Sequence, residues 1–398
     1  MFQSSIQLYR NAYSGLSRSM WWLSLVMFIN RCGTMVIPFL TVYLTAKGYS
    51  LAQAGYVMAA FGGGSILGGY IGGRLTDRFG HLHVQFFSLL LNGILFIVLG
   101  QMQTFWQFAS CIFVLSSLGE AFRPANSAAI ASYSNETNRT RCYSLNRLAI
   151  NLGWAVGPAV GGFLAGINYA LLFWADGITC ILASVLLYFV FSPGRVKKTA
   201  VHEQVKKTSD SAYRDRTFLK GMFYIFLVGL CFFQMFSTIP VYYKEVVHLK
   251  ESTIGWVLAM NGLIIAFIEM VMVYKLENRR RPEQYMMAGA LLIGLAFLTL
   301  YTAREFTVVL SSMIIITFGE MLLFPFMNNF WVKRSTEKNR GQYAALYTMS
   351  FSAAIVLAPT FSSQVATWLG FDALWIINFF VCTFASIGFF LLKTRTTT

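Results

Sequence analysis

The 398-residue chain is poor in charged side chains, and most of those it has are of one sign. Only 12% of its residues are Asp, Glu, Lys or Arg, whereas soluble domains carry about 25%. Because 56% of the residues are hydrophobic and the mean hydropathy is +0.58, the composition excludes an ordinary soluble protein. The 16 acidic residues are outnumbered by 31 basic ones, which leaves a net charge of +15 to be explained.

Histidine and cysteine are scarce and scattered. Three of the four histidines fall in expected loops and the fourth lies alone near one surface, so no His/Asp/Ser group gathers on one helix face (His81, His83, His202 and His248). The six cysteines show no CxxC or other metal-like spacing, and no glycine-rich nucleotide-binding loop occurs. We therefore expect no metal site, no cofactor and no enzymatic activity.

Apolar runs of the ~20 residues needed to cross a bilayer recur along the whole chain. They predict an all-α membrane protein with twelve transmembrane helices, at residues 20–44, 52–73, 83–101, 106–131, 145–166, 169–191, 219–243, 253–274, 285–302, 306–330, 343–368 and 371–392. Residues 1–19 are polar and do not resemble a cleavable signal.

The basic residues are distributed unevenly between the expected loops. With both termini on one side, the loops on the other side hold four Lys or Arg, and Arg31 and Arg123 fall deep inside helices. The remaining 25 lie at the termini, in the central loop, and in the even-numbered loops or the helix ends next to these segments. Lys and Arg concentrate on the cytoplasmic side of membrane proteins. We expect a multi-pass protein of a cell inner membrane with both termini cytoplasmic, surrounded by lipid and without a nucleic-acid partner.

The sequence repeats itself after about 200 residues. "SLAQAGYVMAAFGGG" (50–64) aligns with "ESTIGWVLAMNGL" (251–263), "RLTDRFG" with "KLENRRR", and "LGEAFRP" (118–124) with "FGEMLLFP" (318–325). This predicts two pseudo-symmetric six-helix bundles, at 1–192 and 219–398, joined by a basic cytoplasmic linker at 193–218. Two similar bundles in a membrane can rock around a central site and expose it to each side in turn.

The stretch "GGRLTDRFGH" stands at the end of the second expected helix. It resembles the signature G-x-L-x-D-R-x-G-R/K between helices 2 and 3 of the major facilitator superfamily, through Gly73, Leu75, Asp77, Arg78 and Gly80. This resemblance implies a latch that closes the cytoplasmic side, with Asp77 facing the start of helix 11 near Tyr343. Glu136 is a candidate partner of Arg78. The alternative is a solvated loop that only fixes topology.

A second string, "NLGWAVGPAVGG" (151–162), resembles the helix 5 signature of superfamily exporters, especially drug:proton antiporters. The matching residues are Gly153, Gly157, Pro158, Gly161 and Gly162. Glycines four residues apart give a flat helix face for close packing, and the proline is expected to bend the helix. Generic helix packing would explain the glycines but not the whole ordered string.

Ionisable side chains at mid-membrane cost about 2.5–3.5 kcal/mol each, so they normally face a cavity and have a partner or a function. The candidates for proton coupling or the cavity are Glu120, Glu320, Glu269, Arg31, Arg123 and Asp176. Glu120 and Glu320 are mates in the repeat and are favoured as proton carriers, with Glu269 third. The alternative is a set of buried ion pairs, such as Arg31 with Glu120, that only orient helices.

Polar amides inside apolar helices also need partners and are candidates for the substrate cavity: Asn30, Gln234, Asn261 and Asn328. Drug:proton antiporters of the superfamily often carry an acidic residue in helix 1, where this chain has Arg31. An anionic or zwitterionic substrate therefore remains open.

These observations predict a monomeric, proton-coupled secondary transporter. We expect it to export small amphipathic or lipophilic compounds by alternating access. The alternatives are uptake or export of a specific metabolite, lipid or metal chelator, and, with less support, a membrane enzyme or a receptor that does not transport.

Overall fold

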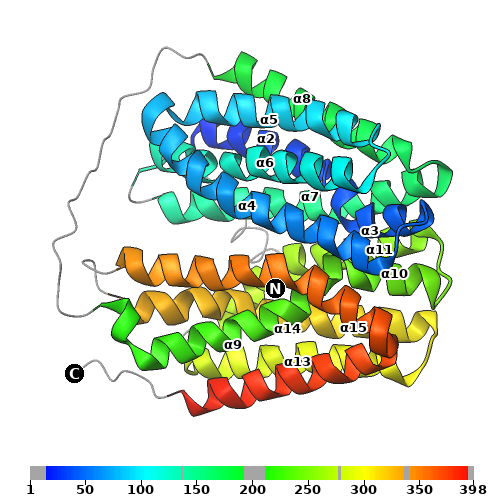
Figure 1. The fold of residues 1–398 in the computed structure, drawn as a ribbon. Helices are drawn as coiled ribbons and strands as arrows, with labels where there is room; N and C mark the ends of the chain where they lie inside the picture. Colours follow the sequence, from blue (N-terminus) through cyan, green and yellow to red (C-terminus); the bar gives the residue numbers. More distant parts are fainter. Residues whose placement is uncertain (1–14, 136–137, 192–210, 277–278, 336–339, 393–398) are drawn as a thin grey trace, which may run out of the picture. The chain divides into compact units, whose positions relative to one another are not determined.

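The computed structural model describes residues 15–135, 138–191, 211–276, 279–335 and 340–392, and these ranges contain helices and no strand (Figure 1). The chain forms two compact units. The first comprises Met1–Val36 and Gly63–Val196, and the second comprises Ile37–Gly62 and Lys197–Thr398. Residues 37–62 therefore group with the second unit, although they precede residue 192.

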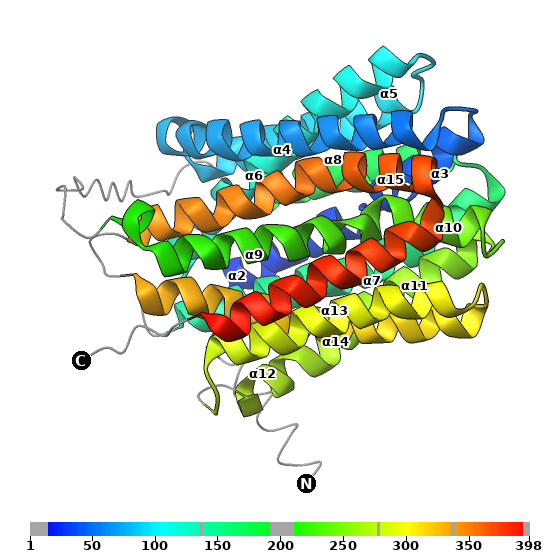
Figure 2. The same ribbon diagram turned by 60° about the horizontal axis from the view of Figure 1, so that its bottom comes forward.

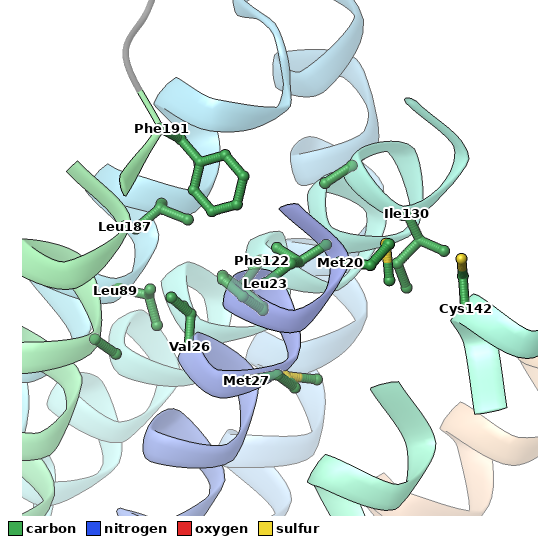
Figure 3. Close-up of a cluster of buried hydrophobic side chains, with 12 residues drawn as sticks. Met20, Leu23, Val26, Met27, Leu89, Phe122, Ile130, Cys142, Leu187 and Phe191 are labelled. Atoms are coloured by element: carbon green, nitrogen blue, oxygen red, sulfur yellow. The ribbon is translucent and has the colours of Figure 1, made fainter. Parts of the chain in front are cut away.

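The first unit is built from long helices packed side by side. These are α2 (Arg18–Cys32), α5 (His81–Leu99), α6 (Phe105–Tyr133), α7 (Arg139–Ile167) and α8 (Ala170–Val190), together with the second part of α4 (Leu51–Phe79). One face of α2 inserts Met20, Leu23, Val26 and Met27 among apolar side chains of α5, α6, α7 and α8 (Figure 3). Burial of this cluster fixes the position of α2.

The second unit contains α9 (Arg216–Phe232), α10 (Thr238–Glu245), α11 (Glu251–Ile264), α12 (Met270–Leu276), α13 (Pro282–Thr302) and α14 (Phe306–Arg334). The element α15 (Arg340–Leu391) is two helices, because Gly370 has φ 83° and turns the chain back on itself (Figures 1 and 2). Its two halves and α9, α13 and α14 pack together. The short α3 (Val36–Ala46) and the first part of α4 complete this unit.

Ten stretches of the described chain are long and apolar enough to cross a membrane. One of them, Ala345–Leu391, contains both halves of α15, and the 29-residue α4 is long enough to span but lies outside this set because glycines and charges lower its hydropathy. The prediction of an all-α membrane fold is confirmed. The helix ends differ in one place that matters: α4 continues to Phe79 instead of ending near 73.

The first helix of each repeat is interrupted at the corresponding position. The first membrane span breaks at residues 33–35, between α2 and α3, and the seventh is interrupted by a 3-10 turn, η2 (Phe233–Phe236), between α9 and α10. The eighth span is also irregular, with a π-helical turn, η3 (Ile265–Glu269), between α11 and α12. Breaks of this kind leave backbone groups that other residues must satisfy in a membrane.

A buried ion pair ties the start of α9 to the end of α14. Arg334 donates from Nε and Nη2 to the two carboxylate oxygens of Asp215, at 3.1 and 3.0 Å, and the Tyr343 hydroxyl donates to the same carboxylate at 3.0 Å. Asp215 also accepts from the N–H of Phe218 and so caps α9. In the first unit Ser17 caps α2 and donates to the carbonyl of Tyr133 at the end of α6, which is the weaker copy of this tie.

We predict that Asp215→Asn lowers the stability of the protein near neutral pH. Partial burial raises the pKa of Asp215, but the hydrogen bonds from Arg334, Phe218 and Tyr343 outweigh burial and hold the pKa below its ordinary value of 3.8. A depressed pKa contributes stability above the unfolded value, and this contribution is lost as the pH falls through the folded value.

The measurement is the thermal unfolding midpoint in detergent between pH 7 and pH 3. The difference between wild type and Asp215→Asn should be largest at pH 7 and shrink below about pH 4. Asp372→Asn is the matched control, because Asp372 forms an exposed ion pair with Arg304. A difference between wild type and Asp215→Asn that persists unchanged at pH 3 would contradict the prediction.

Candidate functional site

The break in the first membrane span is held by Asp176 of α8. The N–H of Met35 lies 3.0 and 3.1 Å from the two carboxylate oxygens of Asp176, and the N–H of Val36 lies 2.8 Å from the second. These two amides therefore do not form the usual helical hydrogen bonds to carbonyls four residues earlier. Pro38 has no N–H, so the carbonyl of Thr34 also lacks its usual helical partner. Asp176, which is fully buried, is thus the cap of the second half of this span.

The glycines of the helix 5 string pack against the same break. A Cβ on Gly153 would lie 2.4 Å from the Cβ of Arg31, and one on Gly161 would lie 2.9 Å from the Cβ of Met35. A Cβ on Gly157 would face the carbonyl oxygens of residues 31, 32 and 34 at 3.2–3.3 Å. The predicted flat face therefore exists, and its contact is the interrupted helix.

The other two residues of that string play different parts. Pro158 lies inside α7, which continues without interruption from Arg139 to Ile167. The proline therefore does not end the helix. Gly162 is buried. The close contact to the first membrane span thus comes from Gly153, Gly157 and Gly161.

Arg31 is positioned by this contact and lacks an ion pair. Its stem lies against Gly153, and its Nε atom is buried without a hydrogen-bond partner. The side chain is within electrostatic range of Glu120, Arg123 and Cys180. The Arg31–Glu120 pair considered from the sequence does not form. The neighbouring Asn30 donates a weak hydrogen bond to the sulfur of Cys180 at 3.6 Å.

Glu120 pairs instead with Arg123, one turn further along α6. The Nη2 atom of Arg123 lies 3.1 Å from one carboxylate oxygen and 3.4 Å from the other. The Glu120 side chain is 20% exposed, whereas that of Arg123 is 68% exposed. The two residues are three apart in the sequence and therefore lie on one face of α6, which allows this contact.

Glu320 has a different neighbour from its repeat mate. The side-chain amide of Asn261 on α11 donates to Glu320 on α14 at 3.0 Å and to the hydroxyl of Thr317 at 3.0 Å. Thr317 in turn donates to the carbonyl of Met313. Two of the sequence candidates, Asn261 and Glu320, are therefore brought together.

Glu269 lies at the end of the π-helical turn of the eighth span. It is buried, and the turn packs against α14. A π-turn changes which side of a helix the following residues face, and such turns are frequent at functional sites.

Gln234 and Asn378 form a reciprocal amide pair that sequence reasoning found only in part. Gln234 donates to Asn378 at 3.0 Å and Asn378 donates back at 2.8 Å, both side chains being fully buried. Gln234 belongs to η2, so Asn378 contacts the break of the seventh span as Asp176 contacts that of the first.

A repeat signal for this correspondence is present in the sequence. "DGITCILAS" (176–184) aligns with "NFFVCTFAS" (378–386) at a shift of 202 residues, and the final serines donate to the carbonyls of Phe86 and Met287, which are themselves repeat mates. Alignment of these two segments would have predicted the role of Asn378.

The G-x-L-x-D-R-x-G string is helical almost to its end. Leu75, Asp77 and Arg78 lie on the last turns of α4 and are exposed, and Gly80, with φ 83°, forms the turn into α5. A Cβ on Gly73 would meet no atom within 4 Å. The glycines of α4 that pack closely against α6 are Gly64, Gly68 and Gly72, the last of which precedes Gly73 by one residue. Gly73 is thus not the packing glycine that the motif suggested.

The remaining candidates are not in these clusters. Asn328 is exposed, donates to the carbonyl of Phe324 and accepts from the indole of Trp331. Glu136 lies outside the described residues. Among the side chains that the structure describes, no group of three or more His, Cys, Asp or Glu could hold a metal ion.

Comparison with known proteins agrees with this architecture. Residues 23–344 match the model of the family described as Major Facilitator Superfamily. The chain is 25% identical to a "Na(+), Li(+), K(+)/H(+) antiporter" of Planococcus maritimus, over 88% of this chain and 89% of that protein. It is 22% identical to "Multidrug resistance protein 2" of Bacillus subtilis (strain 168), over 72% and 74%. A solved POT family transporter in complex with 5-aminolevulinic acid has the same fold, with a TM-score of 0.80, 17% identity and coverage of 97% and 98%.

We predict that Gly153→Ala destabilises the protein and Gly166→Ala does not. The new methyl group at 153 overlaps Arg31 and forces the helices apart, at a cost of about 1–3 kcal/mol. Gly166 lies on the same helix with nothing within 4 Å of its Cβ position, which makes it the matched control. Thermal unfolding midpoints in detergent test this, and equal midpoints for the two variants would contradict it.

We also predict that Asp176→Asn is tolerated better than Asp176→Leu. Asparagine keeps an acceptor oxygen for the amides of Met35 and Val36, whereas leucine leaves buried N–H groups unpaired at roughly 1–3 kcal/mol each. The check is the yield and unfolding midpoint of the purified variants. Equal losses in both would show that the charge, and not the hydrogen bond, is needed.

Proposed function

The chain belongs to the major facilitator superfamily, and from this premise we propose that it is a proton-coupled exporter of small amphipathic or lipophilic compounds. Membership makes it a multi-pass membrane carrier of small molecules and not an enzyme. Export and proton coupling are our proposal. The helix 5 string and the relative named as a multidrug resistance protein support it.

The observation that carries the proposal is the contact between Asn261, Thr317 and Glu320. An asparagine side chain has both a donor and an acceptor, so it can hydrogen-bond an ionised carboxylate through its N–H and a protonated one through its oxygen. Thr317, whose hydroxyl donates to the carbonyl of Met313, holds the same Asn261 side chain in place by accepting from its amide. Glu320 is therefore placed among groups that can follow a change of its protonation state.

Glu120 is in a different situation. Its carboxylate is already paired with the guanidinium of Arg123, at 3.1 Å, whereas Glu320 accepts from an uncharged amide. We therefore assign the transported proton to Glu320, and to Glu120 the task of balancing charge in the first unit. The two repeat mates have diverged in function because they have acquired different neighbours.

The interrupted helices support a carrier mechanism. Membrane transporters commonly place their substrate and ion sites at discontinuous helices, where backbone groups are free to bind and the chain can bend. Each unit of this chain contains one such break, at residues 33–35 and at η2. We propose that proton uptake and substrate binding bias the protein between inward- and outward-open states.

The setting follows the distribution of charge. We propose that the protein is a monomer in a cell inner membrane with both termini cytoplasmic, because basic residues concentrate at the termini and in the linker. The exposed Asp77 and Arg78 on the end of α4 are proposed to act as the cytoplasmic latch.

The test is proton flux in proteoliposomes challenged with lipophilic cations, zwitterions and anions. We predict that Glu320→Gln reduces substrate-triggered proton movement at least tenfold. Glu120→Gln should reduce substrate turnover and leave its dependence on the proton gradient in place. Glu305→Gln is the matched control, since Glu305 is an exposed acid at the start of α14.

Substrate efflux that survives dissipation of the proton gradient would contradict proton coupling. Flux triggered by Na⁺ or K⁺ alone would instead assign cation antiport, the activity named for the relative from Planococcus maritimus.

A further inference from the structure

Arg31 is a half-buried cation with a buried Nε atom, and no described carboxylate forms an ion pair with it. Its Nε atom is shielded from solvent and unpartnered, and no hydrogen bond or ion pair links its guanidinium to a described residue. Buried arginines normally pair with a carboxylate, because an unpaired charge away from water costs several kcal/mol. Glu120, the acid within its electrostatic range, is already bound by Arg123.

The charges around Arg31 do not cancel. The groups within its electrostatic range are Glu120 and Arg123 from α6 and the thiol of Cys180 from α8. With Glu120 ionised, two arginines face one carboxylate, so the group carries one net positive charge.

The first unit also holds Arg31 in place. Gly153 lets the stem of Arg31 lie directly against α7, and the break that follows at residues 33–35 is fixed by Asp176. A guanidinium that is anchored at its stem and unpaired at Nε is preorganised to receive an oxyanion, which it can bind through two parallel N–H donors.

We propose that Arg31 binds an anionic group of the transported compound, a carboxylate in the simplest case. This inference rests on the proposed function and names its substrate class: an amphipathic anion. Arg31 holds the carboxylate, Arg123 adds long-range attraction, and Glu120 competes with the ligand for both arginines.

The test is ligand-induced thermal stabilisation of the full-length protein in a non-ionic detergent. The probes are 4-cyclohexylbutanoate, its neutral amide and 4-cyclohexylbutylammonium, which share one apolar body and differ in charge. A ligand that binds the folded state raises the unfolding midpoint in proportion to its saturation. We expect the carboxylate to half-saturate at a concentration at least tenfold below that of the other two.

The variants separate a binding role from a structural one. Arg31→Gln should weaken carboxylate binding at least tenfold, and Arg31→Lys should weaken it less, because lysine keeps the charge but not the two-pronged geometry. Glu120→Gln should tighten binding about two- to fivefold by removing the competitor. Arg304→Gln, which removes an exposed positive charge, is the control for net charge and should leave binding unchanged.

Equal half-saturation of wild type and Arg31→Gln, a preference for the ammonium probe, or no stabilisation by the carboxylate would each overturn the proposal. Proton flux measured with the same probes distinguishes it from the proposed function. Carboxylate binding through Arg31 without proton flux would refute the coupling and keep the anion site. Proton flux triggered by the ammonium probe alone would support proton coupling and refute the anion site.

Discussion

The hydrogen bonds from the backbone of residues 35 and 36 to Asp176 are the interaction on which the first unit depends. A membrane-spanning helix cannot stop at mid-span unless its freed amides find acceptors, because lipid offers none. Asp176 supplies those acceptors from α8. Once the break is stable, its backbone can lie flat on the glycines of α7, and that contact in turn holds the stem of Arg31. The position of Arg31 thus depends on the contact with the glycines of α7, and that contact depends on the hydrogen bonds to Asp176.

The second unit has a different contact at its interrupted helix. The seventh span breaks at η2, where Gln234 and Asn378 bond each other through two amide hydrogen bonds. The shared positions of Asp176 and Asn378, and of Cys180 and Cys382, show that both breaks descend from one ancestral arrangement. What has diverged is the charge: an acid and an arginine in the first repeat, amides in the second. The same divergence separates Glu120, beside Arg123, from Glu320, beside Asn261.

The sequence predicts the parts of this protein that depend on local pattern. Apolar runs predicted the helices, whereas the ion pair named from the sequence, Arg31 with Glu120, is replaced by Arg123 with Glu120. The break at residues 33–35 was not predicted, because Gly33 and Pro38 sit inside a continuous apolar run whose hydropathy does not mark an interruption. The partners of Asp176 and Asp215 are backbone amides and an arginine more than 100 residues away, so no local spacing reveals them. The register of the packing glycines, 64, 68 and 72, depends on which side of α4 faces α6, which only packing decides.

The reciprocal pair of Gln234 and Asn378 carries no ionisable group, so acidification leaves its hydrogen bonds as they are. Its counterpart at the first break includes a carboxylate. The interrupted helix of the second half therefore contacts an uncharged amide pair, whereas that of the first half contacts a carboxyl group. Duplication followed by a single amide-for-acid difference is enough to make two structurally equivalent halves chemically unequal.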